Sequence, residues 1–355
     1  MSSFWDGKKV LVFGGTGFLG VHVCRWLLSH GAQVSVFDFR EPSSLSMLDF
    51  KHIPLVIGDI RDLHAIRRAY SQQKIELVFH LAAIPTISGA TAQTYEDINV
   101  KGTQNILQVS HDFGVSKIVY VSSSTVYGIP STFPAQENDP LKPLGKYGRS
   151  KLEAEKVCLK FIDKGDAISI IRPRVIMGPG RMGIFSILFS RIKAHQPVFL
   201  IGSGQNIFQF TGVSDMVKAC VLVAQSSSSD IFNIGSDDQD CVREVMMKLL
   251  HHAKSKSKLI SLPPRIARLA LWGLEQLKLT PLMSEQYGIA DKNFKLDTSK
   301  AKRILGWIPQ ESNASCLISA YDWFCEHAPK GAPQYKSFFS VLGKFRKSHQ
   351  SAFQK

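Results

Sequence analysis

Tyr147 and Lys151 stand four residues apart in the segment KYGRSK, residues 146–151, where a helix is predicted to start. Residues with this spacing share one face of a helix. A phenol with a pKa of about 10 is a poor base at neutral pH, but a nearby ammonium group favours the phenolate. The pair therefore indicates a tyrosine that can exchange a proton with a substrate.

Three consecutive serines add hydroxyl groups to this chemistry. Ser122, Ser123 and Ser124 follow a predicted strand in the segment VSSSTVYG, residues 121–128. Any of them could donate a hydrogen bond to a substrate oxygen. A Tyr-x-x-x-Lys spacing by itself is common in solvated helices, so its meaning depends on the motifs that precede it.

Three glycines near the N-terminus predict a phosphate-binding turn. The segment VLVFGGTGFLG, residues 10–20, leads from an apolar strand into Gly14, Gly17 and Gly20. Gly14 would make the tight turn, Gly17 would bring backbone amides close to a pyrophosphate, and Gly20 would let the next helix sit close to the strand. Asp38 ends the following strand, where a ribose-binding carboxylate is expected.

The identity of the dinucleotide depends on the charges beside its ribose. Asp38 can accept hydrogen bonds from both ribose hydroxyls and repels a 2′-phosphate, which favours NAD over NADP. Arg40 could pair with such a phosphate, so NADP stays open. Asp59 of GDIRD could reach the adenine, and the small Ala82 and Ala83 of FHLAA leave room for the cofactor.

The elements that position these residues alternate between short apolar strands and amphipathic helices. Strands are predicted near residues 9–14, 33–38, 54–58, 76–81, 117–122 and 167–172. Helices are predicted at about 18–30, 62–72, 95–113, 147–163, 184–195, 214–225 and 241–253. Apolar strands that alternate with helices indicate a parallel sheet covered on both faces. We therefore expect an α/β fold, with a Rossmann-type doubly wound parallel sheet and a smaller C-terminal substrate-binding domain.

The expected domains divide the chain into three parts. Residues 1–172 form the dinucleotide-binding Rossmann domain, residues 173–329 form a substrate-binding region partly interleaved with it, and residues 330–355 form a basic tail. The stretch 262–279 carries a stripe at helical spacing, for which burial is the favoured interpretation and a membrane or partner contact the alternative. That stripe consists of Ile266, Leu269, Ala270, Leu274 and Leu277.

Composition excludes several classes of protein. With 44% hydrophobic and 20% charged residues, the 355-residue chain is typical of soluble globular proteins. It has neither an apolar run of roughly 20 residues nor a secretory leader, so a cytoplasmic location is expected. The six scattered cysteines predict reduced thiols and no metal site. The net charge of +14 is diffuse except in the tail, which indicates a solvated or membrane-seeking extension rather than a nucleic-acid clamp.

Taken together, the motifs resemble those of the extended short-chain dehydrogenase/reductase superfamily, also called the NAD-dependent epimerase/dehydratase family. The resemblance covers residues 8–326 and includes GGTGFLG, GDI, HLAA, INVKGTQNIL, SSSTVYG, YGRSK, RPRVIMGPG and SKAKRILGWIP. It implies that Tyr147 is the acid/base, that Lys151 orients the nicotinamide ribose, and that Ser123, three residues before Val126, binds the reacting hydroxyl. The cofactor-binding set that we expect is Gly14, Thr16, Gly17, Phe18, Leu19, Gly20, Asp38, Arg40, Asp59, Ile60, Leu81, Ala82, Ala83, Asn99, Tyr147, Lys151 and Pro173.

The resemblance also implies a reaction in which hydride leaves a secondary alcohol carbon as Tyr147 removes the hydroxyl proton. The resulting ketone could be released by a dehydrogenase, reduced on its other face by an epimerase, or dehydrated. Sugar dehydratases of the family carry an Asp-Glu pair at the positions of Ser124 and Thr125, and decarboxylases carry a Glu at the second position. Neither residue here can do that acid–base work, so dehydration and decarboxylation are disfavoured.

Two departures leave the substrate open. Relatives that act on nucleotide sugars usually carry an Asn where this chain has Val175, and an Arg and a His where it has Phe208 and Gly212. Other arginines could replace the lost contact with the phosphate; the candidates are Arg174, Arg181 and Arg191. Alternatively, the segment IGSGQNIFQFTGVSDMVKA looks more like the branch that oxidises 3β-hydroxysteroids and β-hydroxy acids.

Two further expectations concern an apolar substrate pocket and the assembly of subunits. An apolar substrate would suit Phe185, Phe189 and Phe208, although any of them could simply belong to the core. The resemblance implies a homodimer through the helices at 95–113 and 147–163. The alternative from another class is a non-catalytic NAD-binding scaffold or a membrane-surface protein.

Overall fold

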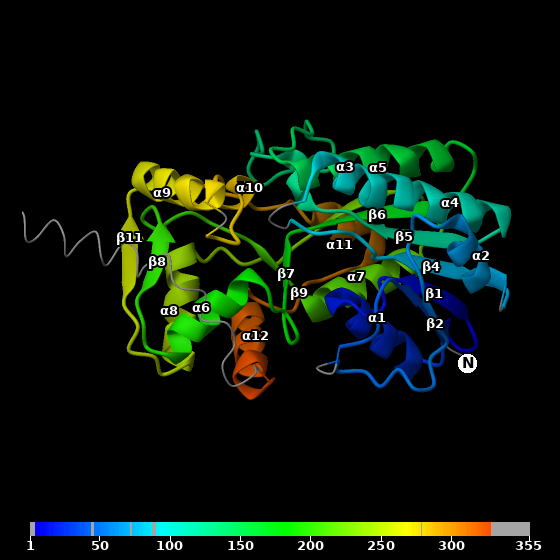
Figure 1. Ribbon diagram of the computed structural model, residues 1–355, viewed down its shortest axis with the longest axis horizontal. Coiled ribbons are helices and arrows are strands. Elements are labelled where there is room, and N and C mark those ends of the chain that lie inside the picture. The colour runs from blue at the N-terminus through cyan, green and yellow to red at the C-terminus, as the bar shows by residue number, and fades with distance from the viewer. Residues whose placement is uncertain (1–3, 44–45, 72, 87–89, 278, 328–355) are drawn as a thin grey trace, which may run out of the picture.

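The computed structural model describes residues 4–43, 46–71, 73–86, 90–277 and 279–327 (Figure 1). The predicted basic tail, residues 330–355, therefore lies outside the described residues. No helix in these ranges has both the length and the apolar character needed to cross a lipid bilayer.

A seven-stranded sheet forms the centre of the larger part of the molecule. Its order is β3-β2-β1-β4-β5-β6-β10, and every neighbouring pair runs parallel. The strands are β1 Lys9–Phe13, β2 Gln33–Asp38, β3 Leu55–Ile57, β4 Leu77–His80, β5 Lys117–Val121, β6 Ile168–Pro173 and β10 Ile231–Ile234. The direction of winding reverses between β1 and β4, and ligands bind at such a reversal, beyond the carboxyl ends of the strands. This confirms the predicted fold class and all six predicted strands.

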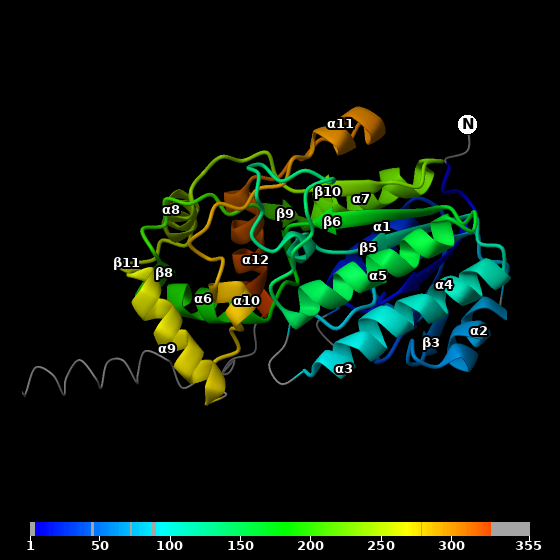
Figure 2. The ribbon, with the colours of Figure 1, turned by 90° about the horizontal axis from the view of Figure 1, so that it is seen from above.

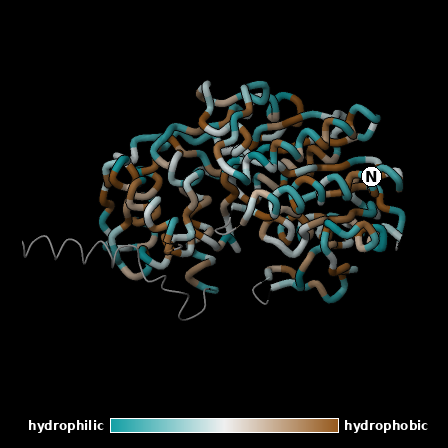
Figure 3. Tube along the Cα trace, turned by 45° about the horizontal axis from the view of Figure 1, so that its top comes forward, coloured by the Kyte–Doolittle hydropathy of each residue, from teal (hydrophilic) through white to brown (hydrophobic). Residues whose placement is uncertain are grey.

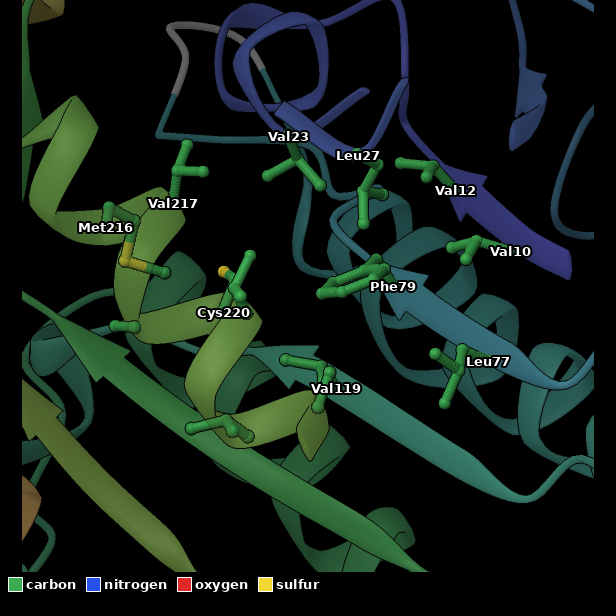
Figure 4. Close-up of a cluster of buried hydrophobic side chains, with 14 of the residues drawn as sticks. Val10, Val12, Val23, Leu27, Leu77, Phe79, Val119, Met216, Val217 and Cys220 are labelled. Atoms are coloured by element: carbon green, nitrogen blue, oxygen red, sulfur yellow. The ribbon is translucent and has the colours of Figure 1, made fainter. Parts of the chain in front are cut away.

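Helices cover both faces of the sheet, as Figures 1 and 2 show. On one face lie α1 Phe18–Ser29 and α7 Val213–Gln225; on the other lie α2 Leu63–Ser71, α4 Gly102–Asp112 and α5 Lys146–Ile162. Alternate side chains of each strand serve alternate faces. In β1, Val10 and Val12 pack toward α1 and α7 (Figure 4). Leu11 and Phe13 pack toward the opposite layer.

The single helix predicted over residues 95–113 is divided by a π-helical segment between two α-helices. A short helix, α3 Ala92–Tyr95, is capped by the side chain of Thr91 and leads into a π-helical segment, Glu96–Lys101, before α4 begins. Widened π turns occur frequently at functional sites, and this one carries Asn99. Periodicity alone could not distinguish it from a continuous α-helix.

The smaller part is built around two short parallel pairs, β7 Val175–Met177 with β9 Phe210–Gly212 and β8 Val198–Ile201 with β11 Leu259–Leu262. Its helices are α6 Ile184–Lys193, α8 Val242–His252, α9 Pro264–Gln276, α10 Ser284–Tyr287 and α12 Asn313–His327. Helix α11, Ser299–Leu305, contacts β10 of the large sheet. Because α7, β10 and α11 come after residue 173 and yet join the large sheet, the chain passes between the two parts more than once. Apolar stretches run through the interior of both parts in Figure 3.

Helix α9 corrects one expectation from the sequence. Ile266, Leu269 and Leu277 were expected to be buried, but they are 65%, 69% and 68% exposed. Leu274 of the predicted stripe is buried as expected, and beside it the helix buries Ala267 and Leu271, which lie outside that stripe. The helix lies at the outer edge of the smaller part (Figure 1), where nothing else in the described chain covers its second apolar side.

Candidate active site

The glycine loop after β1 is shaped to admit a phosphate. Gly14 has a φ of +80°, and a Cβ at this position would lie 2.8 Å from the backbone nitrogen of Ala82. Gly20 packs even more closely, because its Cβ would lie 2.2 Å from the carbonyl oxygen of Gly14. Helix α1 begins at Phe18, and neither a capping side chain nor an acidic residue occupies its first turn, which includes Leu19. Its free amides and the positive end of its dipole therefore suit the pyrophosphate of a dinucleotide.

Asp38 is held rigidly beside this loop. Its Oδ2 accepts hydrogen bonds from the Thr16 amide at 3.0 Å and from Thr16 Oγ1 at 2.7 Å, and its Oδ1 accepts one from the Phe39 amide at 2.8 Å. The carboxylate thus stands at the end of β2, adjacent to the helix N-terminus. Arg40 is exposed and its guanidinium lies 5.3 Å from the centroid of the Phe39 ring. The position of Asp38 fits the predicted ribose ligand.

The ends of β3 and β4 are placed at the same edge. Asp59 is half-buried and paired with Arg61 at 2.6 Å, and this guanidinium holds the pKa of the Asp59 carboxyl below its usual value. Ile60 is buried against Gly102, whereas Leu81 follows β4 and donates its amide to the Phe13 carbonyl at 3.0 Å. Ala83 is half-buried two residues beyond Leu81, and Pro173 is the last residue of β6.

Asn99 is buried and its side chain is committed to protein groups. Its Oδ1 accepts the Ile84 amide at 2.9 Å, and its Nδ2 donates to the Ile84 carbonyl at 3.1 Å and to Ser150 Oγ at 2.9 Å. The Ser150 hydroxyl in turn donates to the Tyr147 carbonyl at 2.8 Å. Asn99 therefore ties the loop after β4 to the first turn of α5, and its predicted contact with a cofactor remains a prediction.

The three residues predicted to be catalytic come together at the end of β5. Ser123 Oγ accepts hydrogen bonds from the Thr125 amide at 3.2 Å and from Thr125 Oγ1 at 3.0 Å, which leaves its own proton for the nearby Tyr147 phenol or for a substrate oxygen. Lys151 is buried, and its Nζ donates to the Val121 carbonyl at 2.8 Å. The same Nζ lies 4.4 Å from the centroid of the Tyr120 ring. From the sequence, Thr125 was noted only as a residue that cannot act as an acid or base, so its hydrogen bonds to Ser123 were not predicted.

Electrostatic surroundings set the proton affinity of this group of residues. Burial raises the pKa of Tyr147 to about 12; the Ser123 hydroxyl and the Arg181 guanidinium oppose that rise, whereas Glu285 adds to it. Burial also lowers the pKa of Lys151 to about 8. Arg181 is therefore a cation that lowers the pKa of Tyr147. That Lys151 lowers it as well remains a prediction.

A buried ion pair behind the serines was not foreseen. Arg172 and Glu155 are each 2% exposed and lie 2.7 Å apart. Glu155 also accepts a hydrogen bond from Ser122, and Arg172 also donates to Tyr127 Oη at 2.9 Å. A charged residue inside the apolar strand AISIIR was the available signal. The network fixes the end of β5 relative to α5 and β6.

Two further residues lie near Tyr147 although they are distant in sequence. The ring centroid of Tyr95 is 6.3 Å from that of Tyr147, and the Tyr95 hydroxyl donates to the Pro85 carbonyl at 3.1 Å. Glu285 of α10 approaches Gly145 and accepts a hydrogen bond from the Gly148 amide at the start of α5. No local spacing in the sequence pairs either residue with the tyrosine.

The three arginines proposed as phosphate ligands occupy different places. Arg174 is buried, and its Nη1 donates to Ser124 Oγ at 3.0 Å. Arg181 lies with its guanidinium 5.4 Å from the centroid of the Phe18 ring, at the start of α1. Arg191 instead donates to the Pro197 carbonyl at 2.8 Å within the smaller part. Only the first two adjoin residues of the predicted site.

The three phenylalanines of the predicted apolar pocket also separate. Phe189 is fully buried in the core of the smaller part. Phe185 and Phe208 are half-buried at the margin of that core, and Phe208 also contacts the cluster that contains Val126. Phe189 is therefore a core residue, and Phe208 is the aromatic residue that adjoins the serine segment.

Comparison with known proteins places this geometry in context. The model of the NAD dependent epimerase/dehydratase family matches residues 10–235. The chain is similar to the UDP-glucose 4-epimerase of Lactobacillus helveticus, with 28% identity over 350 residues, covering 91% of this chain and 98% of the relative. It is also similar to the decarboxylating sterol-4-alpha-carboxylate 3-dehydrogenase of Candida albicans, with 27% identity over 346 residues, covering 90% and 98%.

A solved structure shares the fold over almost its full length. The UDP-glucose 4-epimerase of Thermotoga maritima, solved with UDP-glucose, has a TM-score of 0.73 and 25% identity, and the match covers 90% of this chain and 99% of that one. These matches confirm the resemblance predicted from the sequence motifs.

Proposed function

Because the chain belongs to the NAD dependent epimerase/dehydratase family, and is therefore an enzyme of that NAD-dependent class, we propose that it transfers hydride at a secondary alcohol or ketone carbon with Ser123, Tyr147 and Lys151. One observation supports this assignment: the three side chains converge at the end of β5. The N-terminus of α1, which has no capping side chain, lies at the same edge of the sheet. A scaffold that only bound NAD would not need this group of side chains.

The residues around the glycine loop fit NAD. The amides of the first turn of α1 would hold its pyrophosphate, Asp38 would accept its adenosine ribose hydroxyls, and Lys151 would donate to its nicotinamide ribose. Bound NAD supplies a carbon that accepts hydride and can return it. NADP remains an alternative because Arg40 is exposed and has no carboxylate partner among the described residues.

The protein's own part in the reaction is to move one proton. With an alcohol substrate, Tyr147 takes the hydroxyl proton while Ser123 donates a hydrogen bond to the same oxygen. With a ketone substrate, Tyr147 gives the proton back. The hydrogen bonds from Thr125 to Ser123 fix the serine oxygen, so the serine proton can point toward the substrate.

Two substrate classes fit the proposal. A nucleotide sugar is supported by the relatives that are UDP-glucose 4-epimerases. A 3β-hydroxysteroid or similar β-hydroxy acid is supported by the sterol dehydrogenase relative and by the aromatic side chain of Phe208 in place of a phosphate-binding arginine.

The test measures formation of reduced nicotinamide by absorbance and, for the two UDP-sugars, their interconversion by chromatography, because an epimerase leaves no reduced nicotinamide. The purified protein is offered NAD or NADP with UDP-glucose, UDP-galactose or a 3β-hydroxysterol 4-carboxylate. Tyr147→Phe is expected to lower turnover by about 100-fold or more, since general acid–base catalysis contributes on this scale. Tyr321→Phe, which removes a phenol oxygen from α12 in the core of the smaller part, is the control. Equal turnover in the wild type and Tyr147→Phe would refute the mechanism.

Whether NAD stays bound to the protein during purification distinguishes an epimerase from a dehydrogenase. An epimerase regenerates NAD in place, so its protein should copurify with NAD and show no net reduction. A dehydrogenase must exchange NAD, so its protein should bind it reversibly and accumulate reduced nicotinamide.

We also propose a peripheral contact with an anionic membrane. The predicted contact through the tail at 330–355 lies outside the described residues, but the exposed side of α9 supports it, with Ile266, Leu269 and Trp272 at 65%, 69% and 55% exposure. Aromatic and aliphatic side chains on one side of a helix, accompanied by cations such as Arg265, are typical of interfacial helices. The net charge of +14 favours an anionic bilayer as the surface that α9 contacts.

Vesicle co-sedimentation tests the membrane contact. Binding to vesicles of phosphatidylserine and phosphatidylcholine should exceed binding to phosphatidylcholine alone, and Leu269→Ser with Trp272→Ser should abolish the difference. Met247→Ser removes a similarly exposed apolar side chain, 57% exposed, from α8 and is the matched control. Equal sedimentation of all forms would refute the contact through α9.

Two further proposals concern the setting of the enzyme. A cytoplasmic location is supported by the cysteines, which are free thiols in the described residues. A homodimer through α4 and α5 is supported by their position in the outer layer (Figure 2) and by the exposed Phe113 and Leu159. Light scattering of the wild type and Leu159→Lys would test the dimer, which the lysine should dissociate.

A further inference from the structure

Arg174 is a buried cation that the described protein leaves without a counter-ion. The residue follows β6 and is 3% exposed. Its Nη1 bonds to Ser124, but its Nε and Nη2 have no hydrogen-bond partner in the described part of the chain, and no carboxylate there forms an ion pair with it. Burial lowers the pKa of its guanidinium to about 9. A buried charge with free donors is costly, so such a side chain calls for an explanation.

Arg172, two residues earlier in the chain, is a buried arginine whose donors are all taken. Arg172 is equally buried, but Glu155 holds it through several hydrogen bonds and Tyr127 and the Glu137 carbonyl take the remaining donors. Its pKa is raised, opposite in direction to that of Arg174. The fold therefore satisfies the buried arginine that has a structural role.

Arg174 is also held in one orientation by two aromatic rings. The guanidinium carbon lies 3.8 Å from the centroid of Phe294 and 4.5 Å from that of Phe208. Phe208 and Phe294 form a β-bridge, and the Phe294 amide donates to the Ile207 carbonyl at 2.8 Å. Rings stacked on the faces of a guanidinium leave its in-plane N–H groups available. The clamp therefore prepares two donors in a fixed plane.

Arg174 lies next to the segment that carries the predicted catalytic serine. Arg174 follows β6, the neighbour of β5, and its bonded partner Ser124 is the residue after Ser123. Phe208 comes from the smaller part, between β8 and β9. A group bound to Arg174 would thus lie between the two parts of the molecule, on the opposite side of the serines from the glycine loop.

We propose that Nε and Nη2 of Arg174 bind an oxyanion of the substrate, with Phe208 and Phe294 holding the guanidinium in the plane of that contact. A planar pair of N–H donors matches two oxygens of a phosphate or a carboxylate. This inference rests on the proposed function, because it assigns the substrate end of the same site. The oxyanion could be the diphosphate of a nucleotide sugar or the carboxylate of a hydroxy acid.

Calorimetry on the NAD-loaded full chain distinguishes these sources. The probes are UDP, which carries the diphosphate without the sugar, and 3-hydroxydecanoate, which carries a carboxylate beside the carbinol on an apolar chain. The wild type is expected to bind one probe, and Arg174→Met is expected to bind that probe about 10- to 100-fold more weakly. Arg303→Met removes the same charge from the exposed surface of α11 and should bind like the wild type.

A second readout concerns the free protein. Because Arg174→Met replaces an uncompensated buried charge with an apolar side chain of similar length, it should unfold at the same or a higher temperature than the wild type while losing the probe. If that variant does not fold, Arg174→Lys, which keeps the charge without the planar fork, should bind the probe at least about 10-fold more weakly.

Several results would overturn the proposal. These are wild-type affinity of Arg174→Met for the probe, equal weakening in Arg303→Met, or binding of neither probe by a wild type that still binds NAD. The last result would leave the dinucleotide function intact, whereas failure of the wild type to bind NAD would refute the proposed function itself. Weaker UDP binding in Arg174→Met assigns a diphosphate, and weaker 3-hydroxydecanoate binding assigns a carboxylate.

Discussion

Gly20→Ala tests whether close packing of α1 on the glycine loop creates the phosphate site. The added Cβ would lie 2.2 Å from the Gly14 carbonyl oxygen, 2.6 Å from Gly15 Cα and 2.8 Å from the Gly15 carbonyl carbon. A carbon approaches a carbonyl oxygen to about 3.3 Å at closest, so the helix start must retreat by about 1 Å. The obstacles are backbone atoms of a tight turn, which cannot rotate away as a side chain could.

The expected cost has two parts. Overpacking of this kind destabilises by about 1–3 kcal/mol, which urea unfolding would report as a lower midpoint with an unchanged slope. A displacement of about 1 Å in a binding group can cost about 100-fold in a function that depends on its position. NAD affinity, measured by calorimetry, should therefore fall by more than the loss of stability alone would cause.

Gly273→Ala provides the matched control. Gly273 lies inside α9, and a Cβ there would meet nothing within 4 Å. Alanine is the better helix former by about 0.5–1 kcal/mol, so this variant should be more stable than the wild type and bind NAD equally well. Wild-type stability together with wild-type NAD affinity in Gly20→Ala would refute the packing argument.

Three other variants probe the site at separate points. Arg172→Met should lower the free energy of unfolding by about 3–5 kcal/mol, measured in urea, because it leaves the Glu155 carboxylate buried without its partner. Arg181→Met removes a cation that lowers the pKa of Tyr147, so this pKa should rise. In a plot of kcat/KM for alcohol oxidation against pH, the rise in activity that reports formation of the phenolate should then move to higher pH. Asp38→Asn should weaken NAD binding by about 10-fold and reduce the preference for NAD over NADP, measured by titration of each dinucleotide.

The larger part could be predicted from the sequence because its signals are local. Each strand of the sheet is a short apolar run, and most of them are followed by an amphipathic helix, so the order of elements favours a parallel sheet. Gly14, Gly20 and Asp38 could be predicted as site residues because the expected roles follow from a place at or just after the end of a strand. Tyr147 and Lys151 are one helical turn apart, and that spacing alone puts them together.

The parts that escaped prediction depend on contacts between distant segments. Glu285 reaches the first turn of α5 from α10, and Tyr95 approaches Tyr147 from α3, so no window of sequence contains either pair. For α9, helical periodicity identified the helix but not which of two apolar stripes faces inward. That choice is made by the tertiary neighbours, and the sequence of one helix does not contain them.

Tyr147 shows how binding and proton transfer are connected in this site. Its pKa of about 12 means that the phenol keeps its proton at neutral pH in the described protein. In that form it can give a proton to a ketone, but it cannot accept one from an alcohol until its pKa falls. Arg181 already acts in that direction, and a cationic ring bound beside Lys151 would add a second positive charge. Oxidation of an alcohol should therefore require the cofactor to be in place before the substrate proton can leave, whereas the same tyrosine is ready as an acid without that help.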